Sequence, residues 1–327
     1  MRVLLTGATG FIGSFVLRRL LSCGSHDVAL LAPPGSETWR IDDYLGPCER
    51  IDGDLEDLRP AEASILDFAP EVVVHLAWSG VAARLRDDAC QLANLRGSLD
   101  LVQIALRAGA RAWVGLGSQA EYGPWTGPIR EDAPTRPTSL YGAAKLSCGL
   151  LAGRLCAEAG VRFAWLRLFS AYGPTDDPNR FVPHLIRTLL ESRRPSLTEG
   201  VQLWDYLAAE DAAEAIGLAA VDSEAEGIYN LGSGDAVPLR QVAEMIRDLI
   251  DPAAPLGLGE VPYGHSPVMH LQADVSRLRD ELGWSPRIPL EKGLAELVAW
   301  SRGLPRRPAT APTPAGARPG RPDTRGA

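Results

Sequence analysis

Tyr141 and Lys145 lie four residues apart, in the order Tyr-Gly-Ala-Ala-Lys. Residues at this spacing share one face of a helix, so a phenol and an ammonium group stand side by side. A neighbouring cation stabilises the phenolate and lowers the pKa of the tyrosine toward the working range. Such a tyrosine can exchange a proton with an alcohol or carbonyl oxygen while a hydride moves at the adjacent carbon, and the lysine can reach a cofactor ribose. The alternative is a packed tyrosine beside a surface lysine.

Ser118 is the third candidate for this chemistry. It follows the fourth predicted strand, and the loop at the carboxyl end of a parallel strand faces the ligand crevice. Its hydroxyl can hold the same substrate oxygen as Tyr141. The predicted catalytic set is therefore Ser118, Tyr141 and Lys145.

Lysine is scarce in this chain. Of 33 basic residues only Lys145 and Lys292 are lysine, and the others are arginine. Lys145 therefore marks a position where a compact ammonium group is needed and a planar guanidinium does not serve.

A second motif, GxxGxxG at residues 7–13, follows an apolar run and opens an amphipathic helical pattern. In that context the glycines allow a tight turn, backbone approach to a pyrophosphate and close helix packing, and the helix N-terminus attracts phosphate. The alternative is a glycine-rich turn without a ligand. The dinucleotide-binding residues predicted from this turn are Gly7, Thr9, Gly10, Phe11, Ile12 and Gly13.

Dinucleotide sites usually have an acidic residue at the end of the second strand, which binds the adenosine ribose hydroxyls. In this chain the end of that strand is Leu-Ala-Pro, residues 31–33, without a carboxylate. Without a carboxylate there, and with Ser36 and Arg40 nearby, the pattern slightly favours NADP over NAD. A solvated Arg40 is the alternative. Asp54, followed by Leu55, is a candidate for the adenine edge, and a helix N-cap is an equal explanation for it.

The elements that must position these residues follow an α/β pattern. Apolar runs at 2–5, 28–31, 72–76, 112–116 and 162–168 predict strands, and helical patterns at 11–21, 88–108 and 140–159 alternate with them. This alternation predicts a Rossmann-type doubly wound parallel sheet over residues 1–169. Helices near 183–192, 211–221, 239–250 and 290–301 predict a smaller substrate-binding lobe over 170–304, with some segments returning to the first domain. The composition of 305–327 predicts a disordered tail.

Composition sets further bounds. With 46% apolar and 23% charged residues in 327, wholesale disorder is excluded, and the net charge of -8 disfavours nucleic acid as a partner. Five scattered cysteines without a CxxC pair indicate free thiols in a reducing compartment, and no metal site is expected. No apolar run approaches the ~18 residues of a membrane span, so we expect a cytoplasmic protein without a membrane partner.

The chain resembles the extended short-chain dehydrogenase/reductase family, specifically its NAD(P)-dependent sugar epimerase/dehydratase branch. The resemblance covers roughly residues 1–301. It is carried by the glycine turn, the Ser/Tyr/Lys set, His75-Leu76-Ala77, Asn94 with Gly97, Tyr122-Gly123, Leu166-Arg167-Leu168, Tyr172-Gly173-Pro174, Trp204-Asp205-Tyr206, Glu210-Asp211, Tyr229-Asn230-Leu231-Gly232 and Leu282-Gly283-Trp284-Ser285-Pro286.

The resemblance implies that Ser118, Tyr141 and Lys145 are catalytic, and that the C-terminal lobe binds a nucleotide-linked sugar. It also implies a homodimer joined through the helices at 88–108 and 140–159. Further cofactor contacts are expected at Leu76, Ala77, Asn94 and Phe169. Substrate contacts are expected at Trp78, Gln119, Glu121, Ser170, Arg180, Trp204 and His265, with a structural role as the alternative for Glu121 and a surface role for Arg180 and His265.

Three departures from the family narrow the prediction. Dehydratases of this branch carry Asp-Glu where this chain has Gln119 and Ala120, and neither of these side chains exchanges protons. Before Asp205, where the family usually has an arginine, this chain has Trp204. Where the family often has the arginine of a Pro-Tyr-Arg segment, this chain has Gly264. Both arginines grip a substrate diphosphate, so their loss leaves open a substrate without a nucleotide.

The sequence therefore predicts an NAD(P)-dependent 4-ketoreductase of a nucleotide-activated deoxysugar. The near alternatives are an NAD-retaining sugar epimerase and a reductase of a non-nucleotide substrate. The alternative from another class is a non-catalytic dinucleotide-binding regulator, although such a protein does not need the Ser/Tyr/Lys set. The absence of a GxSxG elbow disfavours a serine hydrolase.

Overall fold

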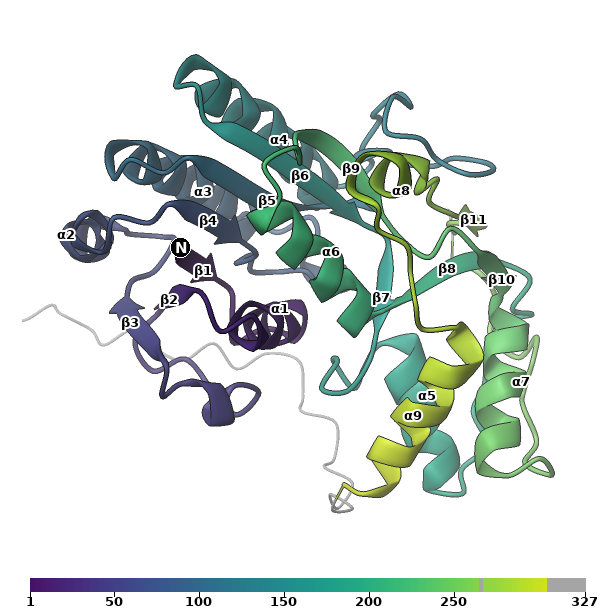
Figure 1. Cartoon of the computed structure of the whole chain (residues 1–327). Helices are drawn as coiled ribbons and strands as arrows, with labels where there is room; N and C mark the ends of the chain where they lie inside the picture. The colour runs from purple at the N-terminus through teal and green to yellow at the C-terminus, as the bar shows by residue number, and fades with distance from the viewer. Residues whose placement is uncertain (265–266, 305–327) are drawn as a thin grey trace, which may run out of the picture.

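A computed structural model describes residues 1–264 and 267–304 of the chain (Figure 1). Two sequence predictions lie outside the described residues: the substrate contact at His265 and the disordered tail at 305–327.

A seven-stranded sheet forms the centre of the molecule, in the order β3-β2-β1-β4-β5-β6-β9. Every pairing in it is parallel, so the predicted doubly wound fold is confirmed. The inner strands are near-continuous apolar runs because helices cover both faces. The bounds are β1 Arg2–Thr6, β2 Asp27–Ala32, β3 Cys48–Asp52, β4 Val72–His75, β5 Ala112–Ser118, β6 Arg162–Leu168 and β9 Gly227–Leu231.

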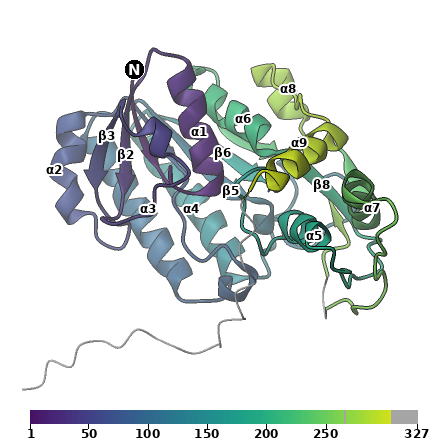
Figure 2. The same ribbon diagram turned by 90° about the horizontal axis from the view of Figure 1, so that it is seen from below.

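The helices form two layers around this sheet, as the two views in Figures 1 and 2 agree. On one face, α1 (Phe11–Ser22) packs beside α6 (Ala209–Val221). On the other lie α2 (Arg59–Phe68), α3 (Cys90–Arg107) and α4 (Leu140–Glu158). The strand order reverses between β1 and β4, and at such a switch point diverging connections leave a ligand crevice beyond the carboxyl ends of the strands.

A smaller sheet is built around β8 (Leu203–Ala208). β7 (Ser170–Tyr172) and β11 (His270–Leu271) pair with β8 in parallel, and β10 (Ala236–Pro238) pairs with it antiparallel. The helices α5 (Phe181–Leu190), α7 (Leu239–Ile250) and α9 (Leu290–Arg302) pack into their own apolar core beside it. The helix that precedes α9, α8 (Ser276–Leu282), contributes instead to the core of the large sheet.

Several elements were not predicted from the sequence. β3, with the sequence CERID, is an edge strand whose charged side chains conceal its β pattern. Because β3 was missed, Ser118 was placed after the fourth strand, whereas it ends the fifth, β5. β9 is also without a sequence prediction, whereas α6 corresponds to the helix predicted near 211–221; both follow residue 170 in sequence, β9 as a strand of the large sheet and α6 packed on it. The domain division at residue 170 stays a prediction.

Three short 3-10 helices complete the description: η1 (Asp42–Tyr44), η2 (Ala83–Leu85) and η3 (Gln119–Glu121). Among the described residues, no helix combines the length and apolarity that crossing a membrane requires.

Candidate functional site

The glycine turn joins β1 to α1 and has little room for side chains. Gly7 has a φ of +74°, and a Cβ on it would lie 2.6 Å from the backbone nitrogen of Ala77. A Cβ on Gly13 would lie 1.9 Å from the carbonyl oxygen of Gly7. Gly10 is the N-cap of α1, and no side chain caps this helix. The first-turn N–H groups therefore remain available to an anion, which fits the pyrophosphate of a dinucleotide.

The ends of β1 and β4 are tied together beside this turn. The Thr6 hydroxyl oxygen accepts hydrogen bonds from the backbone of Leu76 and Ala77, at 3.2 and 3.1 Å. His75 bonds to Thr6 through Nδ1 and to Ser98 through Nε2, each at 2.8 Å. Burial, with a smaller effect of the Lys145 charge, lowers the pKa of His75 to about 3, so its ring is neutral. His75 is thus a strand-end residue that orders the backbone on which Leu76 and Ala77 lie.

The structure brings Ser118, Tyr141 and Lys145 together at the carboxyl end of β5. Ser118 is the last residue of β5, and Tyr141 lies in the first turn of α4, where the Ser139 hydroxyl caps the helix. The Ser118 side chain lies near Tyr141 and acts to lower the pKa of its phenol. Lys145 lies one turn further along α4 and donates to the Leu116 carbonyl at 2.7 Å. All three catalytic candidates are buried, with 4–7% of their surface exposed.

The charges around Tyr141 differ from the sequence expectation. Burial raises the pKa of Tyr141, whereas the Ser118 side chain and the charges of Arg86 and Arg180 lower it. The Arg86 guanidinium carbon lies 5.3 Å from the centroid of the Tyr141 ring. The sequence predicts that the Lys145 ammonium lowers the pKa of Tyr141, but this group lies 3.8 Å from the centroid of the Trp78 ring.

Trp78 therefore stands between two catalytic candidates. Its ring meets Tyr141 edge-on, with centroids 6.3 Å apart, and its indole N–H donates to Gln91 at 2.8 Å. The Gln91 amide in turn donates to the carbonyls of Gly80 and Leu85, which fixes the loop after β4.

Arg86 and Gln91 were missed by sequence reasoning. Arg86 lies in an irregular segment and is one arginine among many. Gln91 carried a usable signal, since it is a polar residue on the inward face of a predicted helix.

Three other predicted cofactor residues, Asn94, Asp54 and Leu55, make structural contacts. Asn94 is occupied by Ser79, donating to its carbonyl and accepting from its N–H, each at 2.9 Å. Asp54 accepts from the backbone of Glu56 at 3.0 Å, so it stabilises a turn after β3 and does not cap a helix. The Leu55 carbonyl packs against Gly97 of α3, where a Cβ would lie 1.9 Å away.

Arg40 lies against the glycine turn. Its guanidinium donates to the Thr9 carbonyl at 3.3 Å and to the Thr175 carbonyl at 3.1 Å. It therefore links the turn to the loop that precedes α5, and it is not a freely solvated surface residue.

The structure shows the contacts of four predicted substrate residues. Ser170 and Trp204 are joined by a 2.6 Å hydrogen bond from the indole N–H, and Trp204 packs on the apolar cluster that contains Phe169. Gln119 begins η3 and is partly buried beside Ser118. Arg180 is half exposed and pairs with Asp176 at 3.4 Å; burial raises the pKa of this carboxyl to about 6.

Glu121 requires a correction. It was predicted to contact substrate, but its side chain is fully buried behind Ser118 and paired with Arg167 at 2.7 Å. The alternative of a salt-bridged structural glutamate describes this position. In the described part of the chain, no group of three or more His, Cys, Asp or Glu side chains is placed to hold a metal ion.

Burial lowers the pKa of Lys145 from 10.5 to about 8, against the opposing charges of Cys148 and Glu121. We expect its ammonium to lose the proton with a midpoint near pH 8. Lysine-selective isotope labelling followed by NMR measures this directly, because Lys292 is the only other lysine in the sequence. In the variant Lys292→Arg, Lys145 is the only lysine, so the one remaining signal belongs to it. A titration midpoint near 10.5 would contradict a lowered pKa of Lys145.

Comparison with known proteins identifies the family. A model of the NAD dependent epimerase/dehydratase family matches residues 3–232. A dTDP-glucose 4,6-dehydratase from Streptomyces griseus is 30% identical over 315 residues, covering 91% of this chain and 93% of that protein. A UDP-glucose 4-epimerase from Azospirillum brasilense is 29% identical and covers 96% of both chains.

A solved structure agrees with these sequence matches. The UDP-glucose 4-epimerase of Thermus thermophilus, in complex with NAD, superposes with a TM-score of 0.83 at 25% identity, covering 93% of this chain and 99% of that one. These relatives catalyse two different reactions, so they do not by themselves assign one. The predicted resemblance is confirmed: the chain is an enzyme of the NAD dependent epimerase/dehydratase family.

Proposed function

We propose that this enzyme is an NADPH-dependent 4-ketoreductase of a nucleotide-activated deoxysugar. The observation that supports it best is the convergence of Ser118, Tyr141 and Lys145 at the end of β5, next to the switch point of the sheet. This set handles a proton at an alcohol or carbonyl oxygen beside a carbon that exchanges hydride.

The cofactor, held by the glycine turn and the first turn of α1, would supply the hydride from its nicotinamide. In the reductive direction Tyr141 donates its phenolic proton to the substrate oxygen. The Ser118 hydroxyl, which lies near Tyr141, orients that oxygen. Burial raises the pKa of Tyr141, which favours the phenol and therefore suits proton donation.

Elimination of water is disfavoured at this site. A dehydratase needs an additional acid and base near the sugar, and the two positions after Ser118 are Gln119 and Ala120. Glu121, one position further, has its carboxylate buried against Arg167 and is not free to exchange protons with a substrate.

The proposed preference for NADPH rests on the segment after β2. No carboxylate stands directly at the end of this strand, where residues 33–36 are Pro-Pro-Gly-Ser, and Arg40 lies against the Thr9 carbonyl of the glycine turn. A guanidinium is the favoured partner of a phosphate because it offers several N–H donors in one plane.

The nucleotide is proposed from the relatives, a dTDP-glucose 4,6-dehydratase and a UDP-glucose 4-epimerase. A cavity of about 290 Å³ in the C-terminal lobe, lined by Phe181, Leu197 and Val261 with Gln202 and Arg240, offers an apolar place for a base. Trp204, which stands where the family has a diphosphate-binding arginine, is turned toward Ser170. We therefore expect weaker diphosphate contacts than in those relatives.

An NAD-retaining epimerase is the second candidate. It is favoured by the similarity to UDP-glucose 4-epimerases, one of which was solved with NAD. The same Ser/Tyr/Lys set serves both reactions, and the fate of the cofactor separates them: a reductase releases it after each turnover, whereas an epimerase retains it.

The reaction can be tested with a panel of 4-keto-6-deoxy sugars, free and nucleotide-linked, by following NADPH oxidation. We expect turnover that falls about 10²- to 10⁴-fold in Tyr141→Phe, because the proton donor is lost while the ring remains. NADPH binding by the variant is the control for folding. Unchanged turnover would contradict the catalytic role, tightly co-purifying NAD with epimerisation would establish the epimerase, and cofactor binding without any turnover would favour a regulator.

The cofactor preference has its own test. Arg40→Ala should weaken NADPH binding about tenfold or more, since a charge-assisted hydrogen bond contributes roughly 1.5–3 kcal/mol. It should weaken NADH binding less, because NADH loses only the support that Arg40 gives the glycine turn through the Thr9 carbonyl. Arg59→Ala, at a side chain that is 87% exposed, is the matched control. Equal losses for both cofactors would contradict a role at the 2′-phosphate.

We also propose a homodimer through α3 and α4. These helices lie side by side on the outer face of the sheet (Figure 2), and α4 carries apolar side chains around its whole circumference. Leu92, Leu150 and Leu151 are 56%, 60% and 48% exposed, an apolar surface that a second copy of this chain would cover.

Leu150→Arg should convert the dimer to a monomer, because it places a charge in the apolar centre of the proposed interface. Light scattering coupled to gel filtration measures the mass. Leu66→Arg, at a leucine of α2 that is 38% exposed, serves as the control and should remain dimeric. A wild-type monomer at micromolar concentration would refute the interface.

A further inference from the structure

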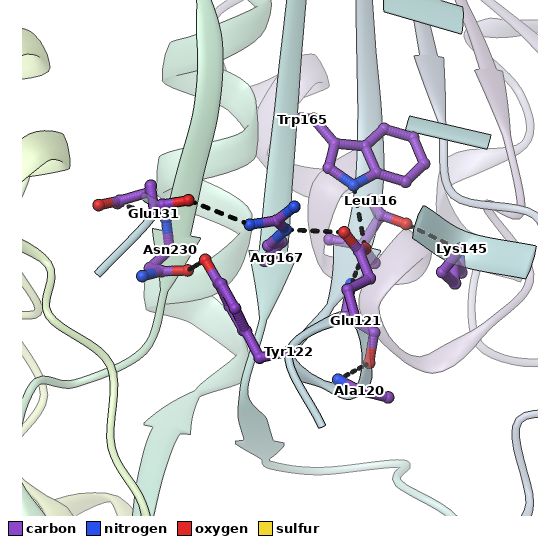
Figure 3. Close-up of polar contacts among 10 residues, drawn as sticks. Leu116, Ala120, Glu121, Tyr122, Glu131, Lys145, Trp165, Arg167 and Asn230 are labelled. Carbon is purple, nitrogen blue, oxygen red and sulfur yellow. Dashed lines mark hydrogen bonds and ion pairs between the residues drawn. The ribbon is translucent and has the colours of Figure 1, made fainter. Parts of the chain in front are cut away.

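Glu121 and Arg167 form a buried charge pair at the carboxyl ends of β5 and β6 (Figure 3). The Glu121 side chain is 1% exposed and that of Arg167 is 3% exposed. Glu121 Oε1 accepts from the backbone N–H of Ser118 at 2.8 Å and from the indole N–H of Trp165 at 3.0 Å. Its Oε2 accepts from Arg167 Nε at 2.7 Å. The carboxylate thus connects the end of β5 to β6.

The geometry at Ser118 is reciprocal. The Ser118 hydroxyl accepts from the Ala120 N–H at 3.2 Å, while Glu121 returns to the Ser118 N–H, which forms a capping box around η3. Both the backbone and the rotamer of Ser118 are restrained by this arrangement. The hydroxyl proposed to meet the substrate oxygen is therefore held by the Ala120 N–H, and the Ser118 backbone that carries it is held by Glu121.

The chain makes unusual room for this carboxylate. Trp165 packs beside it, and a Cβ on Gly115, Gly117 or Gly149 would lie 2.4, 2.3 or 2.9 Å from the indole ring. β5 and α4 thus carry glycines where they pack against the indole that donates to Glu121.

The pair is also anchored on its far side. The Arg167 guanidinium lies 4.5 Å from the centroid of the Tyr122 ring, and the Tyr122 hydroxyl donates to Asn230 of β9 at 2.6 Å. The network therefore spans the carboxyl ends of β5, β6 and β9, so movement of Glu121 is opposed from three strands.

We propose that Glu121 is a positioning residue for catalysis, which fixes Ser118 through its backbone and acts on the reaction only through that serine. This inference rests on the proposed function of Ser118. The essential chemistry is that of a carboxylate: its two oxygens accept from donors on opposite sides, Ser118 and Trp165 on one and Arg167 on the other. A carboxamide offers one oxygen, so it can satisfy only one side.

Glu121→Gln is the first test, since it changes one oxygen to an NH₂ group. We expect kcat to fall about 10- to 100-fold with KM for the substrate and NADPH binding nearly unchanged, because a misplaced catalytic group loses rate rather than binding. Glu131→Gln is the matched control: Glu131 is a partly buried carboxylate near Arg167 that accepts from the Asn230 backbone at 2.8 Å and does not bond Ser118. An equal fall in kcat for both variants would overturn the proposal.

A double-mutant cycle with Ser118→Ala decides whether Glu121 acts through the serine. Glu121→Gln should have almost no further effect on kcat in the Ser118→Ala background, because the group it positions is absent. Independent, multiplicative losses would overturn the inference while leaving the catalytic role of Ser118 intact. A Ser118→Ala variant with full activity would instead refute the proposed function itself.

Glu121→Gln leaves Arg167 without its counter-ion and can therefore fail to fold. For that case the pair Glu121→Leu with Arg167→Met removes both charges, a replacement that buried ion pairs often tolerate. This variant still leaves the Ser118 N–H without its acceptor. A folded variant with the same 10- to 100-fold fall in kcat supports positioning, and a folded variant with wild-type kcat overturns it.

Discussion

Parallel pairing of β1 with both β2 and β4 is the constraint on which the site depends. It makes the chain wind outward in two directions from the centre of the sheet. The connections leaving β1 and β4 therefore diverge, and the crevice between them is where the glycine turn and the loop after β4 lie. Because every strand of the large sheet runs the same way, the ends of β5 and β6 reach that same edge. Residues far apart in the sequence, such as Thr6 and His75, are thereby brought into hydrogen-bonding distance.

Burial is the second determinant of this site. Lys145 and Tyr141 are both almost fully enclosed, and burial moves their pKa values toward the neutral forms, downward for the lysine and upward for the tyrosine. Arg86 and the serine hydroxyl oppose that shift at Tyr141. The negative charge of Glu121 raises the pKa of Lys145 against burial. The acid–base properties of the site thus result from several elements, and the Tyr/Lys spacing alone does not set them.

Close packing around small residues connects the fold to this chemistry. Gly13 allows α1 to approach the turn it opens, and Gly97 allows the segment after β3 to lie against α3. Three further glycines accommodate Trp165 beneath the serine. In each case the missing side chain leaves room for a backbone or ring that supports the crevice, which explains why these positions do not tolerate a Cβ without rearrangement.

The sequence alone determined the fold class and the family, and it predicted the proposed catalytic set, because all three depend on local signals. Apolar periodicity identifies the inner strands, glycine spacing identifies the turn, and helical spacing places Tyr141 and Lys145 on one face. Edge strand β3 could not be predicted because its sequence, CERID, is mostly charged and exposed and shows no apolar alternation. Only the tertiary structure decided what surrounds each group: Arg86 beside Tyr141, Trp78 beneath Lys145, and Glu121 turned away from the crevice toward Arg167. Those contacts join segments that no local pattern relates, and burial and charge in three dimensions set their effect.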